Sequence, residues 1–404
     1  MKYARWFLVL ALLAPLVPAQ DQREDENRKV REIMLKQRRG EQVTAEEREF
    51  VKSVNAQRQQ EFMQQNPSRE STGLVPLTEL KGTYKGEEGG LYPGGGNTPP
   101  PAHLKAGLEI ARRIAPIDGK IVLLSIGMSN TTQEFQVFQK LAAADSDLNP
   151  QLAIVDGAQG GQAADTTADP QANFWNVVEQ RLSAAGVTAK QVQVVWLKQA
   201  IIGLQRPFPA EAKRLQGYLA DTLRNLNDRY PNLKITYLSS RIYAGYATTP
   251  LNPEPHAYEG AFAVKWVIAD QIAGKGPVRP WLAWGPYLWA DGMKGRKDGP
   301  RYLREDLQPS DGTHPSMSGR EKVARQLLEF LKGDPTSRPW FVKANAANGV
   351  LRNPATWTVD FANLQIRGDM FNFLSNVNYS GPAATLPRPP SARSTAPGAC
   401  GWGS

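Results

Sequence analysis

Residues 121–130, IVLLSIGMSN, indicate the kind of sheet on which this protein is built. A run of aliphatic residues between Gly119 and Gly127 is typical of a strand buried on both faces, as in a parallel sheet. Residues 131–133 then begin a helical pattern, so Ser129 lies where a strand turns into a helix. At that place a serine can present its hydroxyl to a ligand in the crevice of an open α/β sheet, or it can simply cap the helix.

Strand and helix patterns alternate along residues 103–333. Strands alternating with helices of ten or more residues predict a parallel sheet with helices on both faces, a three-layer α/β/α sandwich. The glycine-rich turn at residues 156–161 lacks the spacing of a dinucleotide fingerprint. The predicted strands are residues 121–126, 151–155, 191–197 and 235–238, and the predicted helices are residues 104–114, 135–143, 173–185, 210–230 and about 318–332.

The first 19 residues have the pattern of a signal peptide. Lys2 and Arg5 precede the apolar stretch 6–17, and small residues lead to a cleavage site after Ala19. The protein is therefore predicted to be secreted or periplasmic. The apolar stretch is short for a membrane span, so no stable span is expected after cleavage, although an uncleaved anchor is the alternative.

The remaining segments differ from the predicted domain in composition. Residues 20–69 are dense in charge and are predicted to be a helical arm, either a solvated spacer or a partner-binding element. Thr44 followed by Glu47 is typical of a capping box, which places a helix start near Thr44. Residues 70–102 are rich in Gly and Pro and should wrap the surface, residues 334–380 are predicted to be a small appendage, and residues 381–404 a disordered tail.

Composition excludes several classes of protein. The formal charge of +9 comes from Lys and Arg that are spread along the chain without a recognition motif, so no nucleic-acid partner is predicted. The single cysteine, Cys400, cannot form an intramolecular disulfide. With only three histidines a structural zinc site is not expected. Nothing in the sequence indicates an oligomeric state.

A second chemical motif lies just before the last predicted helix. Asp311 and His314 are three residues apart in a predicted turn, where a carboxylate can reach one imidazole nitrogen while the other nitrogen faces outward. A general base has to be oriented in this way. His256 is the alternative base, but no Asp-x-x-His frame accompanies it.

Residues 239–292 depart from the strand and helix rhythm and are interpreted as a loop region. Aromatic and polar residues gather there, as a sugar-binding wall would need, because rings offer apolar faces and their neighbours offer hydrogen bonds. The alternative is that the rings belong to the core. The candidate substrate-binding residues in this region are Arg241, Tyr243, Tyr246, Glu254, Tyr258, Trp284 and Trp289.

The order of these motifs resembles the SGNH (GDSL-like) hydrolase family over residues 104–332. The resemblance implies that Ser129, in the block Gly127-Met128-Ser129-Asn130, is the nucleophile, with Met128 where the family often has Asp. It also implies that Asp311 and His314 are the orienting acid and the base. Asn130 beside the nucleophile is a candidate for substrate binding.

The same resemblance implies an oxyanion hole made from Ser129 and two further residues. The Gly160 amide is the expected donor after the second strand, and Gly161 is its close competitor and a candidate for substrate contact. The family usually has Gly-x-Asn-Asp after the third strand, whereas this chain has Gln199. Gln199 is either a substitute donor or an ordinary polar residue at a strand end.

These expectations together predict a secreted serine esterase. It would hydrolyse an acetyl or other short acyl ester, on a carbohydrate or a small molecule, through an acyl-serine intermediate and without a metal or organic cofactor. The alternatives are a glycan-binding protein that has lost the chemistry, and a cell-envelope scaffold that acts through the charged arm.

Overall fold

The computed structural model describes residues 41–203 and 206–343, together with short pieces between residues 25 and 36. The predicted signal peptide, the disordered tail and most of the predicted appendage lie outside the described residues. No described helix is long and apolar enough to cross a membrane.

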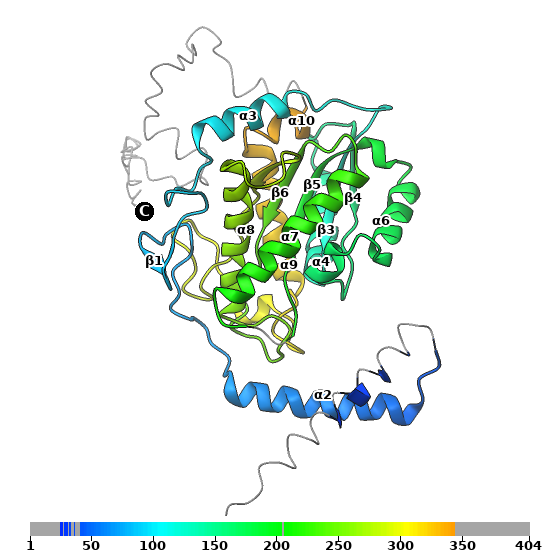
Figure 1. The fold of residues 1–404 in the computed structure, drawn as a ribbon, viewed down its shortest axis with the longest axis vertical. Coiled ribbons are helices and arrows are strands. Elements are labelled where there is room, and N and C mark those ends of the chain that lie inside the picture. The colour runs from blue at the N-terminus through cyan, green and yellow to red at the C-terminus, as the bar shows by residue number, and fades with distance from the viewer. Residues whose placement is uncertain are drawn as a thin grey trace, which may run out of the picture. The chain divides into compact units, whose positions relative to one another are not determined.

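A five-stranded parallel sheet forms the centre of the fold, in the order β4-β3-β5-β6-β7 (Figure 1). Every residue of β3 and β5 is buried, which is the reason for their largely apolar sequences, whereas β4 at one edge is mostly half-buried. The strands are β3 (Ile121–Gly127), β4 (Leu152–Asp156), β5 (Val192–Lys198), β6 (Ile235–Ser239) and β7 (Trp281–Trp284).

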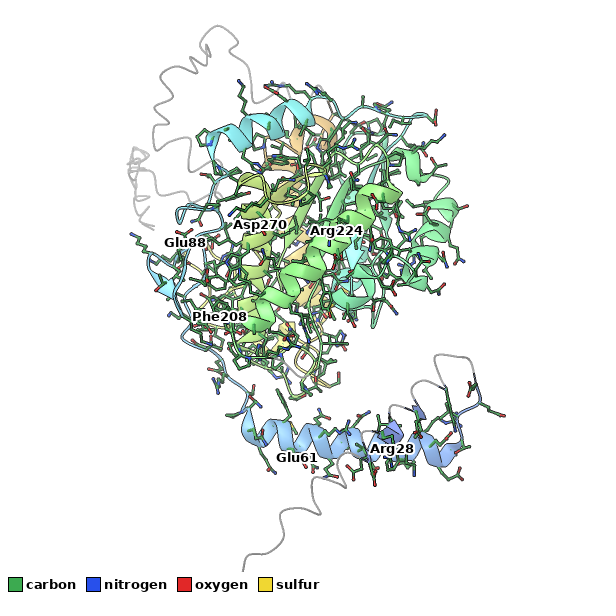
Figure 2. All side chains as sticks on the ribbon, in the orientation of Figure 1. Arg28, Glu61, Glu88, Phe208, Arg224 and Asp270 are labelled. Atoms are coloured by element: carbon green, nitrogen blue, oxygen red, sulfur yellow. The ribbon has the colours of Figure 1, made fainter. Side chains whose placement is uncertain are left out.

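Helices cover both faces of the sheet, which confirms the predicted three-layer sandwich. α4 packs against α9 on one face and α7 packs against α8 on the other. Figure 2 labels Arg224 on α7 and Asp270 on α8, and Asp270 accepts a hydrogen bond from Gln216 of α7 (2.6 Å). These helices are α3 (Pro101–Ala111), α4 (Ser129–Ala144), α5 (Ala164–Ala168), α6 (Asn173–Ala184), α7 (Ala210–Arg229), α8 (His256–Ile272), α9 (Met317–Gly333) and α10 (Arg338–Phe341), with short 3-10 turns η1 (Ala189–Gln191) and η2 (Arg304–Asp306).

The region between residues 239 and 292 is not the loop region that the sequence suggested. It contains helix α8 and strand β7, which completes the sheet beyond β6. Helix α8 is buried over most of its surface. It therefore lacks the single apolar stripe by which a surface helix is predicted from its sequence.

The hydrophobic core extends beyond the predicted domain boundary at residue 333. Trp340, Phe341 and Val342 belong to it, and Phe341 stacks on Phe138 of α4 with ring centroids 6.3 Å apart. The sequence signal was weak because α10 is only one turn long and starts next to a proline.

Two segments precede the domain: helix α2 (Ala45–Gln65), and a strap at residues 69–92 that hydrogen bonds attach to the domain. The predicted capping box is confirmed: Thr44 and Glu47 exchange side-chain to backbone hydrogen bonds at the start of α2. Residues 69–92, which include the short hairpin β1 (Thr83–Tyr84) and β2 (Glu87–Glu88), form a strap that is tied into the core. Buried Asp291 accepts hydrogen bonds from Ser71, Thr72 and Gly73 of this strap.

Candidate active site

Ser129 is the first residue of α4, at the carboxyl end of β3. Strand and helix meet here through Gly127, where a Cβ would collide with the carbonyl of Lys198 at the end of β5. The turn is therefore tight because a residue without a side chain lets two strand ends approach each other. Ser129 is only partly buried, so its hydroxyl lies at the edge of the sheet where α/β proteins bind ligands.

The loop before α9 brings an acid and a base to this hydroxyl. Ser129 Oγ lies 2.8 Å from His314 Nε2, and His314 Nδ1 lies 2.6 Å from Asp311 Oδ2. Both distances are within hydrogen-bond reach, which is the geometric requirement for proton transfer from the hydroxyl. The predicted alternative base, His256, lies elsewhere, at the start of α8 with its Nδ1 3.2 Å from Glu259.

The Asp311 carboxylate is held in its charged form. Burial alone would raise the pKa of Asp311, but hydrogen bonds from the His314 ring and from the His314 and Thr313 amides outweigh it, so its pKa lies below the usual range. An ionised Asp311 accepts the Nδ1 proton of His314, which leaves Nε2 free to accept the proton of Ser129.

The loop that carries Asp311 and His314 depends on one glycine. Gly312 has φ +60°, in the left-handed region, and a Cβ there would collide with the carbonyl of Tyr246. The Thr248 amide also donates to the Asp311 carbonyl (2.8 Å). The loop is thus fixed to the segment that follows β6, and no motif in the sequence indicated this contact.

The loop after β4 lies beside the turn that joins β3 to Ser129. The Gln159 amide donates to the Gly127 carbonyl (3.0 Å), and Arg181 of α6 donates to the carbonyls of Asp156 and Ala158 (2.9 and 2.7 Å). These bonds hold the loop that carries Gly160. Among the described residues, the Gly160 amide has no hydrogen-bond acceptor, which leaves this donor available to a ligand.

Asp156 and Arg181 were not among the predicted site residues. The Asp156 carboxylate accepts from Ser125 of β3 (2.6 Å) and from Thr132 of α4, so it joins β4 to the elements on either side of the turn before Ser129. Its position directly after a predicted strand was the available signal. Arg181 had no comparable signal, because its two acceptors are backbone carbonyls of a distant loop.

Gln199 is not placed to be an oxyanion donor. Its amide nitrogen donates to the Gln162 carbonyl (3.1 Å) and to Thr167 Oγ1 (3.3 Å), and the residue is 3% exposed. Both amide hydrogens are therefore used inside the protein. The longer stem of Gln, compared with Asn, carries the amide past the strand end and into the core.

The predicted aromatic wall is not exposed. All five of its rings are buried, and several donate hydrogen bonds to backbone carbonyls of the strap: Tyr243 to Arg69 (2.7 Å), Tyr258 to Val75 (2.9 Å) and Trp284 to Leu91 (2.7 Å). Burial of their apolar bodies against the strap explains why the rings gather here. The rings are Tyr243, Tyr246, Tyr258, Trp284 and Trp289.

The other predicted substrate-binding residues have varied surroundings. Asn130 is buried and donates to the Thr313 carbonyl (3.0 Å), and Arg241 is buried at 3% exposure. Glu254 accepts from the amides of Ala244 and Tyr258 and from the Trp289 indole. Gly161 has φ +74° and open space around it, which suits a turn at the surface.

No protein-family model matches the sequence, and no curated protein matches it. Among solved structures, the chain is similar to the protein YxiM of Bacillus subtilis (13% identity, TM-score 0.31, covering 53% of this chain and 56% of that one). It is also similar to the periplasmic domain of a lipopolysaccharide acetyltransferase from Salmonella ser. Paratyphi A (11% identity, TM-score 0.31, covering 57% and 88%). A third is a salicylyl-acyltransferase from a tetracycline biosynthetic pathway (16% identity, TM-score 0.30, covering 54% and 56%).

The chain thus spans 56% of the length of the first of these structures. Similarity at this level does not define an activity, so the function has to follow from the side chains of the site.

Proposed function

We propose that this protein is an SGNH-type serine ester hydrolase. The observation that carries the proposal is the continuous hydrogen-bonded chain from Ser129 Oγ through His314 to Asp311. A serine hydroxyl is a poor nucleophile until an adjacent base takes its proton, and an orienting acid keeps the base in the required tautomer.

The reaction would proceed through an acyl-enzyme. Ser129 Oγ attacks the ester carbonyl as His314 Nε2 takes its proton, and the proton then passes to the departing alkoxide. The Ser129 and Gly160 amides would donate to the oxyanion. Water, deprotonated by His314, would release the acyl group and restore Ser129. With Gln199 turned away, these two amides are the donors that support the proposal, and each such donor typically lowers the barrier by about 3–4 kcal/mol.

The proposed substrate is a short acyl ester, such as an acetyl group on a carbohydrate. Support for the carbohydrate comes from the predicted export of the chain. The five aromatic rings are buried, so they cannot stack on a sugar and do not support a carbohydrate substrate. For the same reason they do not support the alternative that the protein only binds glycans.

The test is hydrolysis of 4-nitrophenyl acetate, butyrate and octanoate by the mature protein and by Ser129→Ala and His314→Ala. We expect both variants to lose nearly all activity and the acetate to be preferred. Ser183→Ala, an exposed serine on α6, is the matched control, and His256→Ala tests the other histidine.

Mass spectrometry gives a second measurement. A fluorophosphonate probe should label the tryptic peptide that contains Ser129, and labelling should fail in His314→Ala. Equal hydrolysis by the mature protein and Ser129→Ala would contradict the proposal.

A further inference from the structure

The Asp156 carboxylate, at the end of β4, is surrounded by hydrogen-bond donors. Its Oδ1 accepts from Ser125 Oγ (2.6 Å) and from the Ala158 amide (3.2 Å). Its Oδ2 accepts from Thr132 Oγ1 and, at 3.4 Å, from Gln136 Nε2. An ionised carboxylate has about four acceptor sites and no donor, so these four donors match its whole capacity.

The donors belong to the two parts of the chain that carry the proposed oxyanion amides. Thr132 lies in the first turn of α4, and its amide donates to the Met128 carbonyl (3.1 Å), which closes the helical turn that contains Ser129. Ala158 belongs to the loop after β4, two residues before Gly160. One carboxylate therefore connects the turn that carries Ser129 to the loop that carries Gly160.

The end of β3 supports the same arrangement. Ser125 is 0% exposed, and its hydroxyl also accepts from the amides of Gly157 (3.2 Å) and Ala158 (3.4 Å). A Cβ at Gly157 would lie 2.6 Å from the Ser125 carbonyl, so glycine permits this close approach. A Cβ at Gly160 would meet nothing within 4 Å in the described part of the chain, so the place of the Gly160 amide depends on the anchored residues before it.

We propose that Asp156 is a positioning residue, whose bridge between Thr132 and the Ala158 amide holds the Gly160 amide and the Ser129 amide at the spacing that the oxyanion requires. The inference rests on the proposed function. Oxyanion donors have to lie about 2.7–3.1 Å from the developing charge, and a misplacement of about 1 Å can cost on the order of 100-fold in rate. Because the oxyanion exists only in the transition state, loss of the bridge should lower kcat more than it changes KM.

The first experiment measures kcat and KM for 4-nitrophenyl acetate in Asp156→Ala and Asp156→Asn. We expect Asp156→Ala to lose about 10- to 100-fold in kcat with KM little changed. Asn keeps an oxygen for Ser125 and turns an NH₂ group toward the Thr132 hydroxyl, which can accept, so Asp156→Asn should stay within about fivefold of wild type. Asp228→Ala, which removes an exposed carboxylate near the end of α7, is the matched control.

A double-mutant cycle with Gly160→Pro tests whether Asp156 acts through the oxyanion donor. Gly160→Pro removes the amide that the bridge positions. We therefore expect Asp156→Ala to cost at least about threefold less in the Gly160→Pro background than in the wild-type background. A carboxylate near a helix N-terminus can also simply stabilise the helix. The same fold loss in both backgrounds would show that role alone and would overturn the inference.

A measurement without turnover separates this inference from the proposed function. Hydrogen exchange followed by mass spectrometry compares Ser129→Ala with Ser129→Ala/Asp156→Ala. We expect the peptide that covers residues 157–163 to exchange at least about tenfold faster without the carboxylate, and the peptides of α7 to be unchanged. Faster exchange in a protein without esterase activity would refute the proposed function but keep the bridge. Unchanged exchange in an active esterase would refute the inference alone.

A folded Asp156→Ala enzyme with the kcat of wild type would also overturn the inference. If Asp156→Ala does not fold, Thr132→Val takes its place, because it removes only the hydroxyl through which α4 reaches Asp156. It should show the same lowered kcat and the same coupling to Gly160→Pro.

Discussion

Ser129 Oγ and His314 Nε2 lie 2.8 Å apart, although 185 residues separate them along the chain. The first comes from the start of α4 and the second from the loop before α9, and these two helices pack against each other on one face of the sheet. The packing of these two helices thus brings the Ser129 hydroxyl and the His314 imidazole together.

Asp311→Asn should lower kcat by roughly 10³- to 10⁴-fold with little effect on folding. An amide in place of the carboxylate can present its NH₂ group to His314 and hold the ring in the wrong tautomer. Steady-state kinetics on 4-nitrophenyl acetate, with circular dichroism as the folding control, measure this. A loss below tenfold would mean that Asp311 does not orient the base.

Gly160→Pro should lower kcat by about 10²- to 10³-fold, because proline removes the backbone N–H that we assign to the oxyanion. Gly160→Ala is the matched control. A Cβ at this position meets nothing within 4 Å, so alanine keeps the amide and should retain most of the activity. Equal activity of the two variants would exclude the Gly160 amide as a donor.

Gln199→Met should affect stability more than catalysis. It removes hydrogen bonds to the Gln162 carbonyl and Thr167, and leaving these buried groups unpaired should cost about 1–3 kcal/mol in the free energy of unfolding. We expect kcat/KM to change by less than about threefold. Urea unfolding and steady-state kinetics on the same preparation of Gln199→Met measure the two effects. A 100-fold loss of kcat would instead support Gln199 as an oxyanion donor.

Lys198→Met should destabilise the protein by about 3–5 kcal/mol, because it leaves the Glu134 carboxylate buried without its cation. The double variant Glu134→Gln/Lys198→Met removes both charges and should recover much of this loss. Urea unfolding at pH 7 measures both. An additive loss in the double variant would show that the two side chains act independently.

Glu254→Gln should change how stability depends on pH. Burial raises the pKa of Glu254 to about 7, so the folded state holds this proton more tightly than the unfolded state does. The stabilisation from this group is therefore complete below about pH 4.5 and is lost as the pH rises through 7.

Gln cannot titrate, so the variant does not lose stability in this way. The unfolding free energy of the variant minus that of wild type should therefore rise by on the order of 2 kcal/mol from pH 5 to pH 8. Parallel pH curves for the two proteins would show that Glu254 titrates as an ordinary surface carboxyl.

The sequence by itself determined the elements that have a clear hydrophobic pattern. The strands at residues 121–127 and 192–198 are mostly apolar because helices cover both faces of the sheet, so their positions were predicted to within one or two residues. Ser129, Asp311 and His314 were also predicted from the sequence as candidate site residues, and the structure brings their side chains within hydrogen-bond distance of one another.

Tertiary structure alone decided what the neighbouring side chains face. The aromatic residues of the predicted wall and Gln199 have the chemistry of a binding site, but the five rings are buried in the protein and the Gln199 amide donates to the Gln162 carbonyl. The pairing of Lys198 with Glu134 likewise depends on which strand lies beside which helix. The sequence shows that a polar or aromatic side chain is present. Only the packing of the folded chain decides whether that side chain contacts water, a substrate or another part of the protein.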